Sequence, residues 1–97
     1  MKPDGSDAEK VQLQHPEGKN MPRIDTTKYA VIHQGIIDVL EKNGEMKPMK
    51  MLHALDEHLR GRIDGSITWY GESVKLDMQA KGELVHNKKK GFLWFNN

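Results

Sequence analysis

Apolar residues in the middle of this chain recur every three or four positions, which is the pattern of an amphipathic helix. In the segment 26–43 the recurring residues are Tyr29, Ile32, Ile36, Val39 and Leu40. Asp25 is suited to cap the start of a helix there. Gly44 is suited to end it, because glycine adopts the left-handed conformation without a Cβ clash. The pattern predicts a first helix over residues 26–43.

A second helix is predicted from Pro48 to about Arg60. Proline suits the first turn of a helix, because its φ is fixed and its missing N–H would have no partner there. Gly61 follows as a stop signal. The side chains expected to form the buried stripe of this helix are Met49, Leu52, Leu55 and Leu59.

A third helix is predicted to begin at Ser66 or Thr68, either of which could cap it, and to extend to Lys81 before Gly82. The residues expected to face the first helix are Tyr70, Val74 and Met78. A second apolar stripe, with Ser73 inside it, consists of Trp69, Leu76 and Ala80. Because this helix has two apolar faces, we expect it to be covered twice. The second cover could be the N-terminal segment, the aromatic residues of the C-terminus or another copy of the protein.

The two ends of the chain have extended patterns. Residues 83–86 and 92–95 read as strands joined by a polar segment that ends at Gly91, which predicts a β-hairpin. Near the N-terminus, Val11 and Leu13 alternate with glutamines before His15-Pro16, which suits a short strand or an extended arm. We expect residues 1–10 to be a disordered polar tail, 11–25 an extended arm and 26–97 one folded domain.

Three helices followed by a two-stranded hairpin predict an α+β fold with the element order of a winged helix-turn-helix domain. Three segments of the chain, VQLQHPEGK, IDTTKY and VKLDMQAKGELV, carry a resemblance. They resemble a family of small, mostly bacterial proteins of unknown function with a winged-helix-like domain. The resemblance implies the fold and assigns no activity, because winged helices serve DNA binding, protein docking and dimerisation alike.

Composition places the protein in a reducing compartment. The 97 residues include no cysteine, so neither a disulfide nor a thiolate metal site can form. No apolar stretch approaches the roughly 20 residues that span a bilayer, and the N-terminus is too polar for a signal peptide. We therefore expect a soluble, cytoplasmic protein without a membrane segment.

The formal charge of +1 is far from that of a strongly basic nucleic-acid-binding protein. Most of the positive excess lies in one run near the C-terminus, Lys88, Lys89 and Lys90. A solvated hairpin tip that discourages edge pairing and a phosphate contact are both open interpretations of this run.

A DNA-binding winged helix inserts its third helix into the major groove, while the hairpin contacts the flanking backbone. On this hypothesis the lysine run contacts double-stranded DNA, and the groove-facing residues are Thr68, Glu72, Lys75 and Gln79. Acidic residues outnumber basic ones over residues 68–83, which disfavours contact with phosphates. The alternative is a protein-interaction or dimerisation module without nucleic-acid binding, whose contact surface is Trp69, Leu76 and Ala80.

Two further expectations concern the third helix. Trp69 and Tyr70 are expected to pack in the core with their polar tips at the surface, and a role in base stacking or ligand recognition is the alternative. Asp77 lies in an apolar segment, so we expect a hydrogen bond or salt bridge there that orients the helix.

The sequence has no recognisable catalytic motif. His53 and His58 are five positions apart in HALDEH, which does not match HExxH or HxxEH, so we expect a pair of surface residues without a metal. His33 is expected at the boundary of the first helix's buried stripe. There is no cysteine nucleophile, GxSxG elbow, phosphate loop or GxGxxG motif. We therefore expect a protein that is not an enzyme and binds no cofactor.

Overall fold

Helix α1 (Thr26–Asn43) has the bounds that its apolar spacing predicts. In this computed structural model, which describes residues 9–87, 89 and 91–95, Asp25 caps the helix. Its Oδ1 accepts hydrogen bonds from the N–H groups of Thr27 and Lys28, at 2.8 and 3.2 Å. At the other end, Gly44 has a φ of 82° and donates its N–H to the carbonyl of Leu40. Both predicted caps of α1 are confirmed.

Helix α2 (Pro48–Leu59) begins at the predicted proline and ends one residue before Arg60. The prediction that Met49 belongs to the buried stripe of this helix is wrong, because its side chain is 63% exposed. Met51 is fully buried instead. Met51 precedes Leu55 by one helical turn, so it lies directly beneath the core-facing leucines, whereas Met49 lies at the edge of the stripe.

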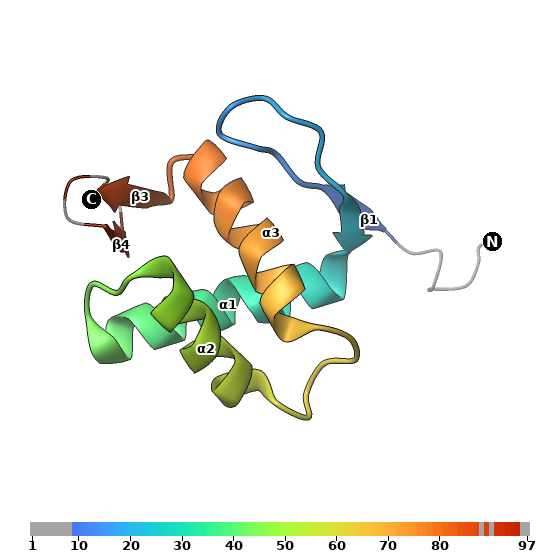
Figure 1. Ribbon diagram of the computed structural model, residues 1–97. Coiled ribbons are helices and arrows are strands. Elements are labelled where there is room, and N and C mark those ends of the chain that lie inside the picture. Colours follow the sequence, from blue (N-terminus) through green and yellow to red (C-terminus); the bar gives the residue numbers. More distant parts are fainter. Residues whose placement is uncertain (1–8, 88, 90, 96–97) are drawn as a thin grey trace.

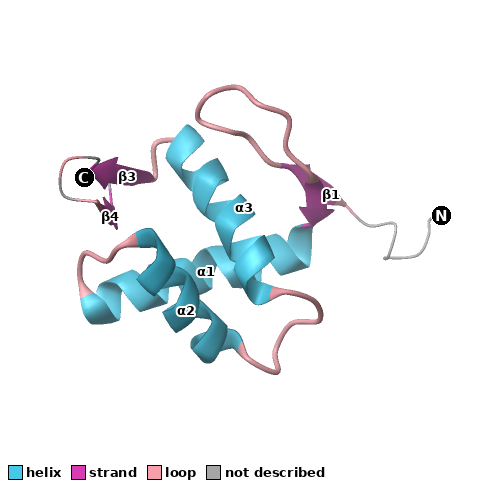
Figure 2. Cartoon of the chain, viewed as in Figure 1, coloured by secondary structure: helices cyan, strands magenta, loops and turns pink. Residues whose placement is uncertain are grey.

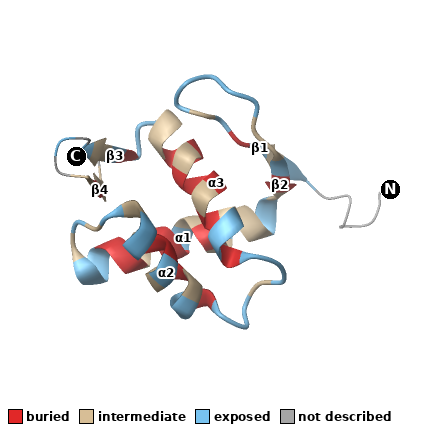
Figure 3. Cartoon of the chain, in the orientation of Figure 1, coloured by how far each residue is buried: buried red, intermediate tan, exposed pale blue. Residues whose placement is uncertain are grey.

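Helix α3 (Ile67–Ala80) begins after Ser66, whose hydroxyl accepts the N–H of Trp69 at 3.1 Å. Each of the three helices contacts the other two, and their inward faces form the core (Figures 1 and 3). The chains of α2 and α3 approach closely at Gly71, where a Cβ atom would lie 2.6 Å from a methyl carbon of Leu55. The predicted core residues of α3, Val74 and Met78, are buried.

The predicted C-terminal hairpin consists of β3 (Leu84–Asn87) and β4 (Phe92–Phe95), which pair antiparallel (Figure 2). This hairpin is attached to the connection between α1 and α2 by a β-bridge. The sequence pattern did not predict this attachment. Met46 forms a β-bridge with Leu93, and each residue donates its N–H to the carbonyl of the other, at 3.3 and 2.7 Å. The start of α2 is therefore held beside β4.

The N-terminal arm is itself a hairpin, whose second strand the sequence pattern did not predict. Strand β1 (Lys10–Gln12) pairs antiparallel with β2 (Arg23–Asp25). The second strand escaped prediction because three residues are too few to show an alternating pattern. Leu13, just after β1, is only 2% exposed and belongs to the core. The predicted tail lies outside the described residues, except for its last two positions.

Candidate functional site

Asp77 joins the arm, α1 and α3 at one buried point. The side chain is 0% exposed. Its Oδ1 accepts the backbone N–H of Gln14 at 2.9 Å, and its Oδ2 accepts the hydroxyl of Tyr29 at 2.7 Å. The ammonium of Lys81 lies 3.0 Å from the same Oδ2 atom. The prediction that Asp77 orients the third helix through polar contacts is confirmed, and these contacts place the arm along one edge of α3.

The arm leaves the outer face of α3 uncovered. We define the outer face as the side of α3 turned away from α1 and α2, with Thr68, Trp69, Glu72, Leu76 and Ala80. Trp69 is 51% exposed, so the expectation that it packs in the core is wrong. The other two members of the predicted stripe, Leu76 and Ala80, are half-buried. The first turn of α3 combines buried Ile67 with exposed Thr68 and Trp69 (Figure 3).

The exposed indole of Trp69 is held in place by its neighbour. Its ring meets the ring of Tyr70 edge-on, with 5.1 Å between the centroids. Tyr70 is half-buried, and the ammonium of Lys28 lies 4.6 Å from its ring centroid. The same ammonium donates to the carbonyl of Asp64 in the loop before α3. Helix α1 thus supports the aromatic pair from behind.

The residues predicted to face a DNA groove are not all at the surface. Thr68 is exposed, and Gln79 is half-buried. Lys75 is only 7% exposed, and its ammonium lies 3.1 Å from the carboxylate of Glu72. The carboxylate therefore offsets the positive charge of Lys75 on this side of α3. The outer face offers apolar groups and the carboxylate of Glu72 where a phosphate-binding helix would offer cations.

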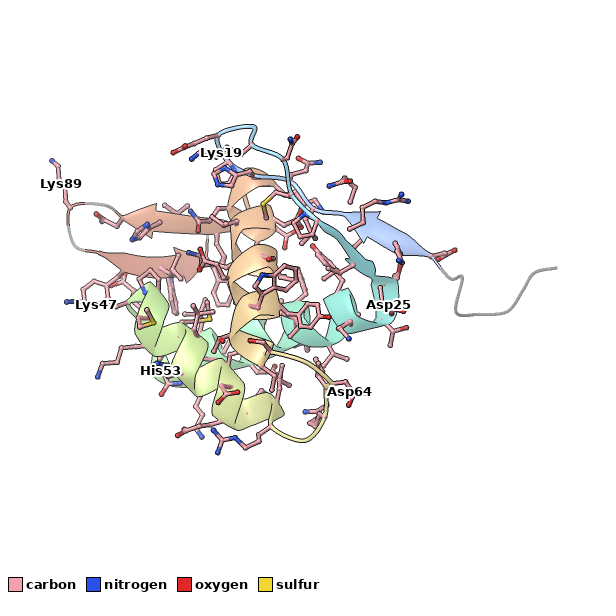
Figure 4. The ribbon with its side chains drawn as sticks, turned by 45° about the vertical axis from the view of Figure 1, so that its right-hand side comes forward. Lys19, Asp25, Lys47, His53, Asp64 and Lys89 are labelled. Carbon is pink, nitrogen blue, oxygen red and sulfur yellow. The ribbon has the colours of Figure 1, made fainter. Side chains whose placement is uncertain are left out.

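Lysines gather around the C-terminal hairpin. Lys89 is exposed at its tip, and the predicted phosphate contacts Lys88 and Lys90 lie outside the described residues. The bridge between Met46 and Leu93 brings further exposed lysines to this end of the molecule, and Figure 4 shows Lys47 and Lys89 projecting from it. We define the lysine surface by the exposed residues Lys42, Lys47, Lys50 and Lys89.

None of these four lysines forms an ion pair within the part of the chain that the structure describes. Sequence reasoning found only the hairpin run, because Lys42, Lys47 and Lys50 lie some forty residues before it. Two glutamates, Glu41 and Glu45, are exposed in the same segment as the three added lysines.

The histidines form polar contacts between elements. Nε2 of His58 lies 3.3 Å from Asp38, beside an open hollow of about 420 Å³ between α1 and α2. Hydrogen bonds from Gln34 and His58 lower the pKa of Asp38. His33, at the boundary of the core as predicted, lies 2.6 Å from Glu83. His53 is exposed.

Within residues 9–87, 89 and 91–95, no group of three histidine, aspartate or glutamate side chains is arranged to hold a metal ion. In the same part of the chain, no helix is both long and apolar enough to cross a membrane.

Comparison with known proteins gives a family without a known activity. No curated protein and no solved structure matches the chain. One family model, described as a family of unknown function, matches residues 10–93, which include β1, β2, all three helices, β3 and the first half of β4. The chain therefore belongs to this family of unknown function, DUF6958.

Proposed function

We propose that this protein is a winged-helix domain that binds the phosphate backbone of double-stranded DNA through its lysine surface. The element order supports the winged-helix assignment, because the hairpin directly follows the third helix. The bridge between Met46 and Leu93 supports it further, since it pairs one residue of the connection between α1 and α2 with the hairpin.

The observation that carries the binding proposal is the concentration of charge at one end of the molecule. Among the described residues, 41–50, 84–87, 89 and 91–95 together contain four lysines and two acidic residues, Glu41 and Glu45, a net charge of +2 in a chain whose total is +1, and Lys88 and Lys90 flank Lys89 in the sequence. An excess of this kind attracts a polyanion locally even where the whole protein is nearly neutral.

The proposed contact is with the phosphate backbone of the DNA. It does not include recognition of the base sequence. Lys75 is buried against Glu72, so α3 contributes little positive charge to a groove. Binding of this kind is independent of sequence and sensitive to salt. If about four phosphates are neutralised, affinity falls about 150-fold between roughly 50 and 200 mM salt. The proposed role is one of binding, without catalysis or a cofactor.

The test is a titration of the protein into a fluorescently labelled duplex of arbitrary sequence at these two salt concentrations. We expect saturable binding at the lower salt. The double variant Lys47→Ala/Lys50→Ala should weaken it about tenfold, and Lys88→Ala/Lys89→Ala/Lys90→Ala should abolish it. No binding by the unmodified protein at the lower salt would refute the proposal.

The matched control removes two lysines from the other end of the molecule. Lys10 and Lys19 are exposed on the arm, and Figure 4 shows Lys19 at the tip of its loop, away from Lys47 and Lys89. The double variant Lys10→Ala/Lys19→Ala lowers the total charge by the same amount as the Lys47 and Lys50 variant. If both double variants weaken binding equally, total charge rather than the lysine surface is responsible.

A second candidate function, protein interaction or dimerisation, is favoured by a different observation. Trp69 exposes half of its surface on a face that carries no unbalanced positive charge. Exposed tryptophan is one of the residues that contribute most to protein interfaces.

A further inference from the structure

Two separate elements, the hairpin and the start of α2, contribute lysines to the lysine surface. Lys89 belongs to the hairpin, whereas Lys47 directly precedes α2 and Lys50 lies in its first turn (Figure 4). We infer that Met46, through its backbone pairing with Leu93, holds the lysines of these two elements at a fixed separation, so that both contact one DNA duplex. The inference rests on the proposed function, and it makes Met46 a positioning residue of the lysine surface.

The backbone of the hairpin tip is fixed to the strands of the hairpin. The carbonyl of Asn87 accepts the N–H of Gly91 at 2.6 Å, and the side-chain Oδ1 of Asn87 accepts the N–H of Lys89 at 3.0 Å. Leu93 of β4 is 0% exposed, so its side chain anchors the hairpin in the core. The position of the Lys89 backbone therefore depends on that of Leu93.

The other side of the bridge leads directly into α2. The hydrogen bonds between Met46 and Leu93, at 3.3 and 2.7 Å, use the N–H and the carbonyl of both residues. Lys47 is the next residue in the chain, and its carbonyl accepts the N–H of Met51 at 2.9 Å. The backbone of Lys47 is thus fixed to the first turn of α2 on one side and to the bridge on the other.

A fixed separation favours binding because a DNA duplex is itself stiff over the length of such a contact. When both groups of lysines are already placed, the second contact loses little further conformational entropy after the first has formed. If the hairpin could move relative to α2, binding would first have to order it, and affinity would fall at unchanged charge. The bridge therefore contributes to affinity through geometry.

The test compares Met46→Pro with Met46→Leu in the duplex titration described above. Proline lacks the N–H that bonds to Leu93, and its ring carbon lies where that hydrogen pointed, so it breaks the pairing. Leucine keeps the backbone N–H and a similar apolar volume. We expect Met46→Leu to bind as the unmodified protein does, and Met46→Pro to bind about fivefold more weakly at the same charge. The salt dependence of Met46→Pro should also be shallower, because it contacts fewer phosphates at once.

A second measurement separates positioning from a general loss of structure. Lys47→Ala/Lys50→Ala should weaken binding about tenfold in the Met46→Leu background but less than about threefold in the Met46→Pro background, where these lysines no longer act together with the hairpin. The control Lys10→Ala/Lys19→Ala should have the same effect in both backgrounds. Equal losses from the Lys47 and Lys50 variant in the two backgrounds, or equal affinities of Met46→Pro and Met46→Leu, would overturn the inference alone. No binding by the unmodified protein would refute the proposed function and the inference with it.

Far-ultraviolet circular dichroism must show that Met46→Pro retains its helices. If this variant does not fold, Lys89→Ala is combined with Lys47→Ala/Lys50→Ala in the otherwise unmodified protein. Two groups of lysines that contact one duplex together give losses of affinity that multiply, whereas two groups that bind separate duplexes do not. Losses that fail to multiply would overturn the inference.

Discussion

The hydroxyl of Tyr29 donates a hydrogen bond to Oδ2 of Asp77, with 2.7 Å between the two oxygens. The two residues are 48 positions apart, one on α1 and the other on α3. Oδ1 of the same aspartate accepts the N–H of Gln14 in the arm. One fully buried carboxylate therefore connects three segments of the chain, and it fixes which side of α3 the arm occupies.

Replacing Asp77 should destabilise the protein severely. Asp77→Ala leaves the hydroxyl of Tyr29 and the N–H of Gln14 without their acceptor in a buried place, at a cost of about 3 kcal/mol. Chemical denaturation measures the loss in the free energy of unfolding. Asp56→Ala is the matched control, because its salt bridge with Arg60 is exposed and contributes less than about 0.5 kcal/mol. Equal losses in the two variants would contradict the role of Asp77.

The pH dependence of stability should report on Tyr29. Burial, followed by the hydrogen bond to Asp77, raises the pKa of this hydroxyl above its ordinary value of about 10. Above that pH the unfolded chain loses the proton while the folded chain keeps it. The stabilisation is therefore complete below pH 10 and decreases as the pH rises further.

Denaturation curves at pH 8, 10 and 11 for the unmodified protein and Tyr29→Phe test this expectation. The unmodified protein should lose more stability than the variant between pH 10 and 11, because phenylalanine has no proton to lose. Tyr70 and the lysines are present in both proteins, so their contribution cancels. Parallel pH profiles would show that Tyr29 titrates as an exposed tyrosine does.

The arm should contribute to the stability of the whole domain. Leu13 is 2% exposed within the core, so Leu13→Ala should lower the free energy of unfolding by about 2–4 kcal/mol. Gln14→Ala serves as the control, since the side chain of Gln14 is exposed and only its backbone N–H contacts Asp77. A Leu13→Ala variant as stable as the control would mean that the arm is not part of the core in solution.

The close approach of α2 and α3 should make Gly71 sensitive to a single added methyl group. The Cβ of Gly71→Ala would lie 2.6 Å from a methyl of Leu55 and 2.9 Å from one of Leu52. Leu55 is fully buried, so the clash should cost about 1–3 kcal/mol and outweigh the roughly 1 kcal/mol that alanine adds to helix stability. Thr68→Ala, at an exposed position of the same helix, should change the melting temperature little. A stabilised Gly71→Ala variant would contradict this packing.

The helices could be predicted from the sequence because their signals are local. Asp25, Pro48 and Ser66 begin the three helices through contacts or backbone restraints within a few residues. The hairpin was equally predictable, because a polar segment ending in glycine separates two apolar runs. The error at Met49 shows a limit of the hydrophobic periodicity. The periodicity identifies the centre of a buried helix face more accurately than it identifies the residues at the border of that face.

The candidate surfaces were only partly predictable. The lysine run is visible in the sequence, but its proximity to Lys47 depends on the bridge between Met46 and Leu93. The second stripe on α3 was also visible, yet its exposure could not be predicted, because either the arm or the hairpin could have covered Trp69. Lys75 looked like a groove contact, and helix packing placed it beside Glu72 with little exposure.

The sequence by itself determined the helices, the C-terminal hairpin and the need for a polar partner at Asp77. Each follows from residues close together in the chain, or from the cost of burying a charge without a partner. Only the tertiary structure decided what that partner is, which edge of α3 the arm covers and which lysines share a surface. Gln14 and Asp77 are separated by 63 residues, and no local preference of either residue can select the other. Such contacts are decided when the helices and the arm bury their apolar residues together.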